Sequence, residues 1–98
     1  MAAKDKQRAK QLDQLLQRHP HLVQSDNRKV SSHVQREEGD WYLNTLMIEG
    51  CEAPFKYKRQ KAYKSLAGAK VNLTYYPDQE QIAGLEFEVM RVVRIRQA

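Results

Sequence analysis

The clearest hydrophobic pattern in the chain is an alternation of apolar and polar residues between Leu85 and Ile95. Side chains two residues apart lie on the same face of an extended chain, so this pattern predicts a long, half-buried β-strand. Its apolar face is interrupted only by Arg91 and otherwise consists of Leu85, Phe87, Val89, Val93 and Ile95. A single strand cannot bury an apolar face alone, so other strands are expected to cover it.

Four earlier segments also have the composition of β-strands, at 30–37, 41–49, 55–59 and 70–76. The sequence Glu38-Gly39-Asp40 predicts a tight hairpin between the first two of them. The second segment is apolar on both faces, which is typical of a central strand. The connection over 60–67 is expected to be either a helical turn or an irregular loop.

The N-terminal region has a different pattern, with the period of a helix rather than a strand. Apolar residues recur at spacings of three and four between Lys4 and Arg18, among good helix formers, and these are Ala9, Leu12, Leu15 and Leu16. Pro20 is expected to end this helix. The stripe is narrow, so the helix either docks on the rest of the protein or frays. With the polar stretch that follows, it makes residues 1–29 a helix and linker, and residues 30–98 a separate β domain.

Five strands of unequal length predict a mostly β (α+β) protein, namely a small five-stranded antiparallel barrel with an N-terminal helix. Closure would remove the exposed edges that such apolar strands otherwise present. An OB-like barrel is the first expectation and an SH3-like barrel the second. Phe87→Ala should cost about 3 to 5 kcal/mol if Phe87 is central. The predicted core consists of Trp41, Leu43, Met47, Ile48, Phe55, Val71, Leu73, Leu85, Phe87, Val89, Val93 and Ile95.

The composition narrows the class of protein further. The length of the chain, 98 residues, suits one domain. No apolar run approaches the roughly 20 residues that a membrane span needs. The polar N-terminus lacks the apolar core of a signal peptide, which predicts a cytoplasmic protein without membrane association. The single Cys51 cannot form an internal disulfide. His19 and His21 are too few ligands for zinc, so no metal or other cofactor is expected.

The net charge of +5 is concentrated in one segment, which changes the functional picture. Residues 55–64 contain five Lys and Arg and no acidic residue, whereas the rest of the chain has 12 basic and 12 acidic side chains. Three aromatic residues lie among these cations. Single-stranded DNA or RNA is bound by such mixtures, because cations neutralise phosphates and exposed rings stack on bases. The predicted nucleic-acid or polyanion site consists of Lys56, Lys58, Arg59, Lys61, Tyr63 and Lys64.

The same stretch fits two other interpretations. Alternation places Phe55 and Tyr57 on the face opposite Lys56 and Lys58, so the rings could belong to the core above a merely solvated cationic face. The cations would also suit a protein-interaction or adaptor domain that docks an acidic partner and has no role with nucleic acids.

Catalytic motifs are missing from the sequence. It has no glycine-rich phosphate loop, no paired cysteines and no serine between glycines. The carboxylate pairs Glu37-Glu38 and Glu86 with Glu88 fall where water would keep both members ionised. We therefore expect a small non-enzymatic binding module.

Overall fold

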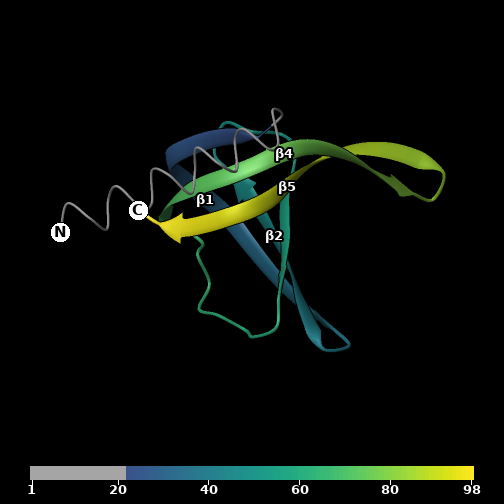
Figure 1. Cartoon of the computed structure of the whole chain (residues 1–98), viewed down its shortest axis with the longest axis horizontal. Coiled ribbons are helices and arrows are strands. Elements are labelled where there is room, and N and C mark those ends of the chain that lie inside the picture. Colours follow the sequence, from purple (N-terminus) through teal and green to yellow (C-terminus); the bar gives the residue numbers. More distant parts are fainter. Residues whose placement is uncertain (1–21) are drawn as a thin grey trace.

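The computed structural model describes residues 22–98, and these form a closed barrel of five strands (Figure 1). The strands are β1 (Val23–Glu38), β2 (Trp41–Ile48), β3 (Phe55–Arg59), β4 (Lys70–Ile82) and β5 (Leu85–Gln97). Their order around the barrel is β1-β2-β3-β5-β4, and β4 pairs with β1 to close it. The expected small, mostly β barrel is therefore confirmed. The predicted helix Lys4 to Arg18 lies outside the described residues.

One pair of strands departs from the antiparallel arrangement that we predicted. β3 runs parallel to β5 through the pairs Phe55↔Met90 and Lys56↔Arg91, whereas the other four neighbouring pairs are antiparallel. A parallel contact needs a long connection between the two strands, and the intervening β4 supplies it. The short β3 is thereby enclosed between β2 and β5.

Strand β1 begins at Val23 and not near Val30, so most of the predicted linker is part of the barrel. The first half of β1 pairs with β4, and the second half pairs with β2. Two bulges, after Ser25 and after Val30, interrupt the pairing and let one strand serve both neighbours. They also break the period-two pattern, which explains why polar residues 22–29 did not indicate a strand.

The core consists of Val30, Leu46, Ile48, Phe55, Val71 and Leu73, each at most 2% exposed. The Phe55 ring packs edge-on against that of Tyr75, with 4.8 Å between the ring centroids. The predictions for Ile48, Phe55, Val71 and Leu73 are confirmed, and Val89 is also buried. Val30 and Leu46 were missing from the predicted core.

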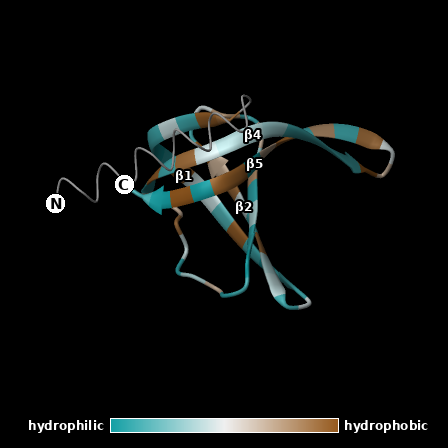
Figure 2. Cartoon of the chain, in the orientation of Figure 1, coloured by the Kyte–Doolittle hydropathy of each residue, from teal (hydrophilic) through white to brown (hydrophobic). Residues whose placement is uncertain are grey.

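Several residues that we assigned to the core are on the surface instead. Trp41, Leu85, Phe87 and Val93 are between 44% and 63% exposed, and Leu43, Met47 and Ile95 are only partly buried. Figure 1 shows the reason for Leu85 and Phe87, because the far ends of β4 and β5 project from the barrel as a hairpin. Figure 2 shows hydrophobic residues along this hairpin as well as in the barrel.

Val93 is exposed because of a bulge in β5. Thr74 pairs with Arg94 but Tyr75 pairs with Val92, so Val93 is an extra residue without a partner in β4. The inward face of β5 therefore shifts by one residue at this point. Met90, Val92 and Ile95 pack against the core in place of the regular alternation that we expected.

The β1–β2 and β3–β4 connections follow the sequence more closely, whereas β4 continues to Ile82, past its predicted end at Tyr76. Gly39 and Asp40 form the turn of the β1–β2 hairpin, between the paired residues Glu38 and Trp41. The segment between β3 and β4 is irregular, which was one of the two alternatives. Within residues 22–98, no helix is long and apolar enough to cross a membrane.

Candidate functional site

One depression on the surface, which we call the outer groove, has a volume of about 820 Å³. It lies on the outer face of β2 and β3, with side chains from all five strands along its walls. The β1–β2 hairpin contributes Arg36 and Glu38, and the base of the β4–β5 hairpin contributes Tyr76 and Glu80. The groove therefore lies where two hairpins meet the barrel.

Strand register explains which side chains face the outer groove. Val34, Thr45 and Lys56 are partners across β1, β2 and β3, and the next outward row is Arg36, Leu43 and Lys58. Partners in neighbouring strands point to the same side of a sheet, so Lys56 and Lys58 face outward together. The same rule turns Phe55 inward, in agreement with its burial.

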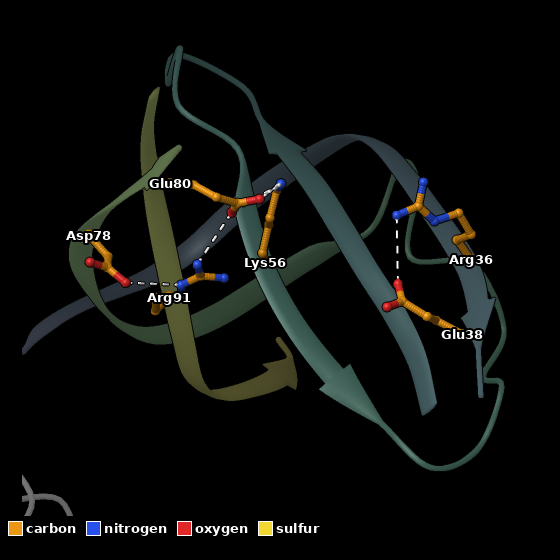
Figure 3. Close-up of polar contacts among 6 residues, drawn as sticks. All are labelled: Arg36, Glu38, Lys56, Asp78, Glu80 and Arg91. Atoms are coloured by element: carbon orange, nitrogen blue, oxygen red, sulfur yellow. Dashed lines mark hydrogen bonds and ion pairs between the residues drawn. The ribbon is translucent and has the colours of Figure 1, made fainter. Parts of the chain in front are cut away.

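Lys56 is part of an ion cluster at one wall of the groove (Figure 3). A single carboxylate, that of Glu80, lies 3.1 Å from Lys56 Nζ and 3.3 Å from Arg91 Nη2. Arg91 Nε donates a second charged hydrogen bond to Asp78 over 3.1 Å. Two carboxylates thus neutralise two cations, which leaves this wall with little net charge.

Asp78 is held in its ionised form at the edge of this cluster. The backbone N–H of Gln79 donates to the Asp78 carboxylate over 2.8 Å, and the hydrogen bond from Arg91 adds to its effect. Together they lower the pKa of Asp78 below its usual value, with the Gln79 N–H as the largest cause. The carboxylate is solvent-exposed, so water screens its contribution to stability.

Lys58 and Arg36 supply the available positive charge of the groove. Lys58 is exposed and makes no ion pair within residues 22–98. Arg36 lies 3.8 Å from Glu38, and both side chains are well exposed. Such a surface pair is weak, so the Arg36 guanidinium can turn toward an anionic ligand at little cost.

Arg59 faces away from Lys58 and lies among aromatic rings. Its guanidinium carbon is 5.5 Å from the centroid of the Tyr57 ring and 5.1 Å from that of Tyr63, within the range of cation–π contacts. Burial raises the pKa of the Tyr57 hydroxyl, and the positive charge of Arg59 lowers it by a smaller amount. Arg59 therefore joins strand β3 to the loop that carries Tyr63.

His33 holds the same loop from the other side. Its Nδ1 accepts a hydrogen bond from the backbone N–H of Leu66 over 2.9 Å, so the proton of the neutral ring is on Nε2. Nε2 lies 2.8 Å from Oδ1 of the buried Asn44. Gln35 adds a hydrogen bond from its side chain to the carbonyl of Tyr63, over 2.6 Å. These contacts fix a loop whose side chains are largely exposed.

The structure divides the six predicted site residues among three places. Lys56 and Lys58 face the outer groove, Arg59 and Tyr63 contact each other beside the β3–β4 loop, and Lys61 and Lys64 are exposed on that loop. Sequence reasoning missed Arg36 and Arg91 in the groove, because they are far apart in the chain and only strand pairing brings them together.

Metal binding finds no support in the part of the chain that the structure covers. No three His, Cys, Asp or Glu residues gather there in a way that could hold an ion. Comparison of the chain with protein-family models, curated proteins and solved structures found no match.

Proposed function

We propose that this protein is a small, non-enzymatic, OB-like binding module that holds single-stranded DNA or RNA in the outer groove. The observation that carries the proposal is the position of the groove on β2 and β3, between the β1–β2 and β4–β5 hairpins. OB-type barrels bind oligonucleotides on the face of the second and third strands, between these same connections. The strand order and the parallel β3–β5 contact favour the OB-like interpretation over the SH3-like one.

The side chains in the groove suit a flexible polyanion with flat bases. Lys58 and Arg36 can neutralise phosphates, and Lys61 and Lys64 extend the cationic path along the β3–β4 loop. Tyr76, 38% exposed on the opposite wall, can stack on a base. Both kinds of contact are independent of base sequence, so recognition of single strands with little sequence preference is expected.

Binding should be weak, because the groove offers few free cations. The carboxylate of Glu80 already occupies Lys56 and Arg91, and a phosphate would have to compete with it. Sequence-independent phosphate contacts usually give dissociation constants of about 10⁻⁴ to 10⁻⁶ M at physiological salt. We expect values in this range, with log affinity falling linearly with log salt concentration.

The test is a fluorescence anisotropy titration of the full chain with labelled single strands of several lengths, at two salt concentrations. Arg36→Glu with Lys58→Glu should abolish binding, because both cations face the groove. The matched control is Lys29→Glu with Lys70→Glu, which changes the net charge equally at paired positions on β1 and β4. Equal loss in both double variants would reduce the effect to net charge alone and overturn the proposed site.

Stacking is tested separately with Tyr76→Ala. Loss of one stacked base should weaken binding by about 1 to 3 kcal/mol, while thermal stability changes little because the ring is partly exposed. Unchanged affinity would show that this ring does not contact the bases.

A protein partner is the second candidate function. Val34 and Val93 are exposed and line the groove. An extended peptide from an acidic protein could therefore contact apolar as well as cationic side chains there. No association with any single strand at low salt would overturn the nucleic-acid proposal and favour this docking role.

A further inference from the structure

The part of the β4–β5 hairpin outside the barrel has an apolar face that nothing in residues 22–98 fully covers. We call residues 78–89 the arm, whose strands pair from Asp78↔Val89 to Ile82↔Leu85. Ile82 is 50% exposed, and Leu85 and Phe87 are similarly exposed. Clusters of exposed apolar side chains of this kind mark interaction sites.

A pocket of about 360 Å³ lies between this arm and the β2–β3 connection. Its apolar lining includes Pro54, Ile82 and Phe87, and the Pro54 carbonyl accepts a hydrogen bond from the Met90 N–H over 2.8 Å. Glu52 and Glu88 are exposed around the same pocket. The pocket thus combines an apolar floor with an acidic rim, which suits an apolar side chain flanked by cations.

The charge of the arm is complementary to that of the N-terminal segment. Residues 78–89 contain four acidic residues and no Lys or Arg. Residues 4–18 contain five Lys and Arg against two Asp, together with Leu12, Leu15 and Leu16 at helical spacing. An amphipathic segment of this composition fits an apolar pocket with an acidic rim.

The direction of β1 leads the chain toward the arm. β1 and β4 are antiparallel, with Gln24 opposite Thr74 and Val23 opposite Tyr75, so the N-terminal end of β1 points toward the arm end of β4. The five steps from Arg18 to Val23 can span up to about 17 Å in extended form, and the helical residues from Leu16 to Arg18 add about 3 Å. Phe87 is opposite Glu80, five residues beyond Tyr75 and only about 17 Å along the strand. Leu16 can therefore reach Phe87.

We propose that residues 4–18 dock as an amphipathic helix on the arm of the same chain. Leu12, Leu15 and Leu16 enter the pocket formed with Pro54, Ile82 and Phe87, and the cations of the segment lie near Glu52 and Glu88. The pocket shares Lys56 and Glu80 with the outer groove, where these two side chains form an ion pair. The determinants of the docking contact are instead the apolar face of the arm and the acidic rim.

The experiment uses the full chain with Cys51→Ser and a nitroxide spin label on Gln14→Cys, which is on the helix side opposite the leucines. Amide signals of Ile82, Leu85 and Phe87 in ¹⁵N-labelled protein should lose most of their intensity through paramagnetic relaxation. Signals at the β1–β2 turn, around Gly39, should keep theirs. Equal intensity loss at both hairpins, or none at the arm, would overturn the proposal.

Two sets of variants test the chemistry of the contact. Changing Leu12, Leu15 and Leu16 to Ser should restore the arm signals, since it removes the apolar stripe. Glu52→Lys with Glu88→Lys should restore them too, whereas the control Glu37→Lys with Glu38→Lys makes the same charge change on the other hairpin and should not. Equal recovery in both charge variants would show that the acidic rim has no specific role.

A mixed sample separates docking within one chain from docking between chains. Spin-labelled ¹⁴N protein is added to ¹⁵N protein that carries no label. The arm signals should keep their intensity in this mixture. Their loss there would overturn docking within one chain and assign the contact to a second copy.

Discussion

At the scale of single residues, Glu80 controls how much positive charge the outer groove presents. Its carboxylate bridges Lys56 and Arg91, and one further carboxylate, Asp78, pairs with the same arginine. A phosphate that enters the groove must displace the Glu80 carboxylate, or it cannot pair with Lys56 and Arg91. Glu80 therefore acts as an internal competitor of the proposed ligand.

Glu80→Gln should consequently tighten binding of single strands. The change removes one negative charge and frees a cation for phosphate, so affinity is expected to rise about tenfold at low salt, with a log–log salt slope steeper by about 1. Titrations at several salt concentrations measure both quantities. Glu37→Gln is the charge-matched control on the β1–β2 hairpin, and a similar gain for it would contradict a specific role of Glu80.

Tyr57 predicts a pH dependence of stability on the alkaline side. Burial raises the pKa of Tyr57 in the folded protein above its unfolded value of about 10. The stability that depends on the neutral Tyr57 hydroxyl is fully present below pH 10 and is lost as pH rises through the pKa of the folded state. Denaturant unfolding between pH 9 and 12 should show this decline, and Tyr57→Phe should reduce it. An identical decline in the variant would exclude Tyr57 as its cause.

At the scale of elements, the two hairpins are shaped by their turns. The turn of the β4–β5 hairpin consists of Ala83 and Gly84, with φ of 52° and 79°. Both values are positive, as a two-residue type I′ turn requires. Glycine adopts this conformation freely, whereas alanine is strained in it, so Ala83 is the weak position of the arm.

Ala83→Asn is expected to stabilise the arm by about 1 kcal/mol, because Asn tolerates the left-handed conformation better than Ala. The arm lies outside the barrel, so local opening reports its stability better than global unfolding does. Hydrogen exchange of the Ile82 and Leu85 amides should slow about fivefold, as 1 kcal/mol implies. Gly84→Ala should have the opposite effect, and faster exchange in Ala83→Asn would contradict the turn assignment.

At the scale of the whole molecule, stability depends on the closed barrel and not on the arm. Leu46 is fully buried among strands β1, β2 and β3, where it pairs with His33 and Phe55. Phe87 is 48% exposed on the arm. The sequence suggested a central Phe87, but Phe87 lies on the projecting start of β5, before the strand enters the barrel.

Leu46→Ala is therefore expected to cost about 2 to 5 kcal/mol of unfolding free energy. Phe87→Ala should cost less than about half as much, in place of the larger loss that the alternating pattern suggested. Urea unfolding followed by circular dichroism compares the two variants directly. A larger loss for Phe87→Ala would mean that the arm belongs to the cooperative core.

Part of the fold could be predicted because its determinants are local. Strands β2 and β3 and the first part of β4 have alternating apolar residues inside the barrel, so Ile48, Phe55, Val71 and Leu73 were placed correctly. The turn at Gly39 and Asp40 could likewise be predicted from the sequence. The long alternation in β5 also predicted a strand, but the bulge at Val93 and the exposed arm changed which of its residues are buried.

By itself, the sequence determined the number of strands, the turn between β1 and β2 and the concentration of cations in 55–64. Only the tertiary structure decided that Lys56 is neutralised by Glu80, that Lys58 faces a groove and that Arg59 lies between two tyrosines. Periodicity and turn propensity belong to neighbouring residues and can be read along the chain. Ion pairs and grooves depend on the register between strands that are distant in sequence, which barrel closure and bulges set.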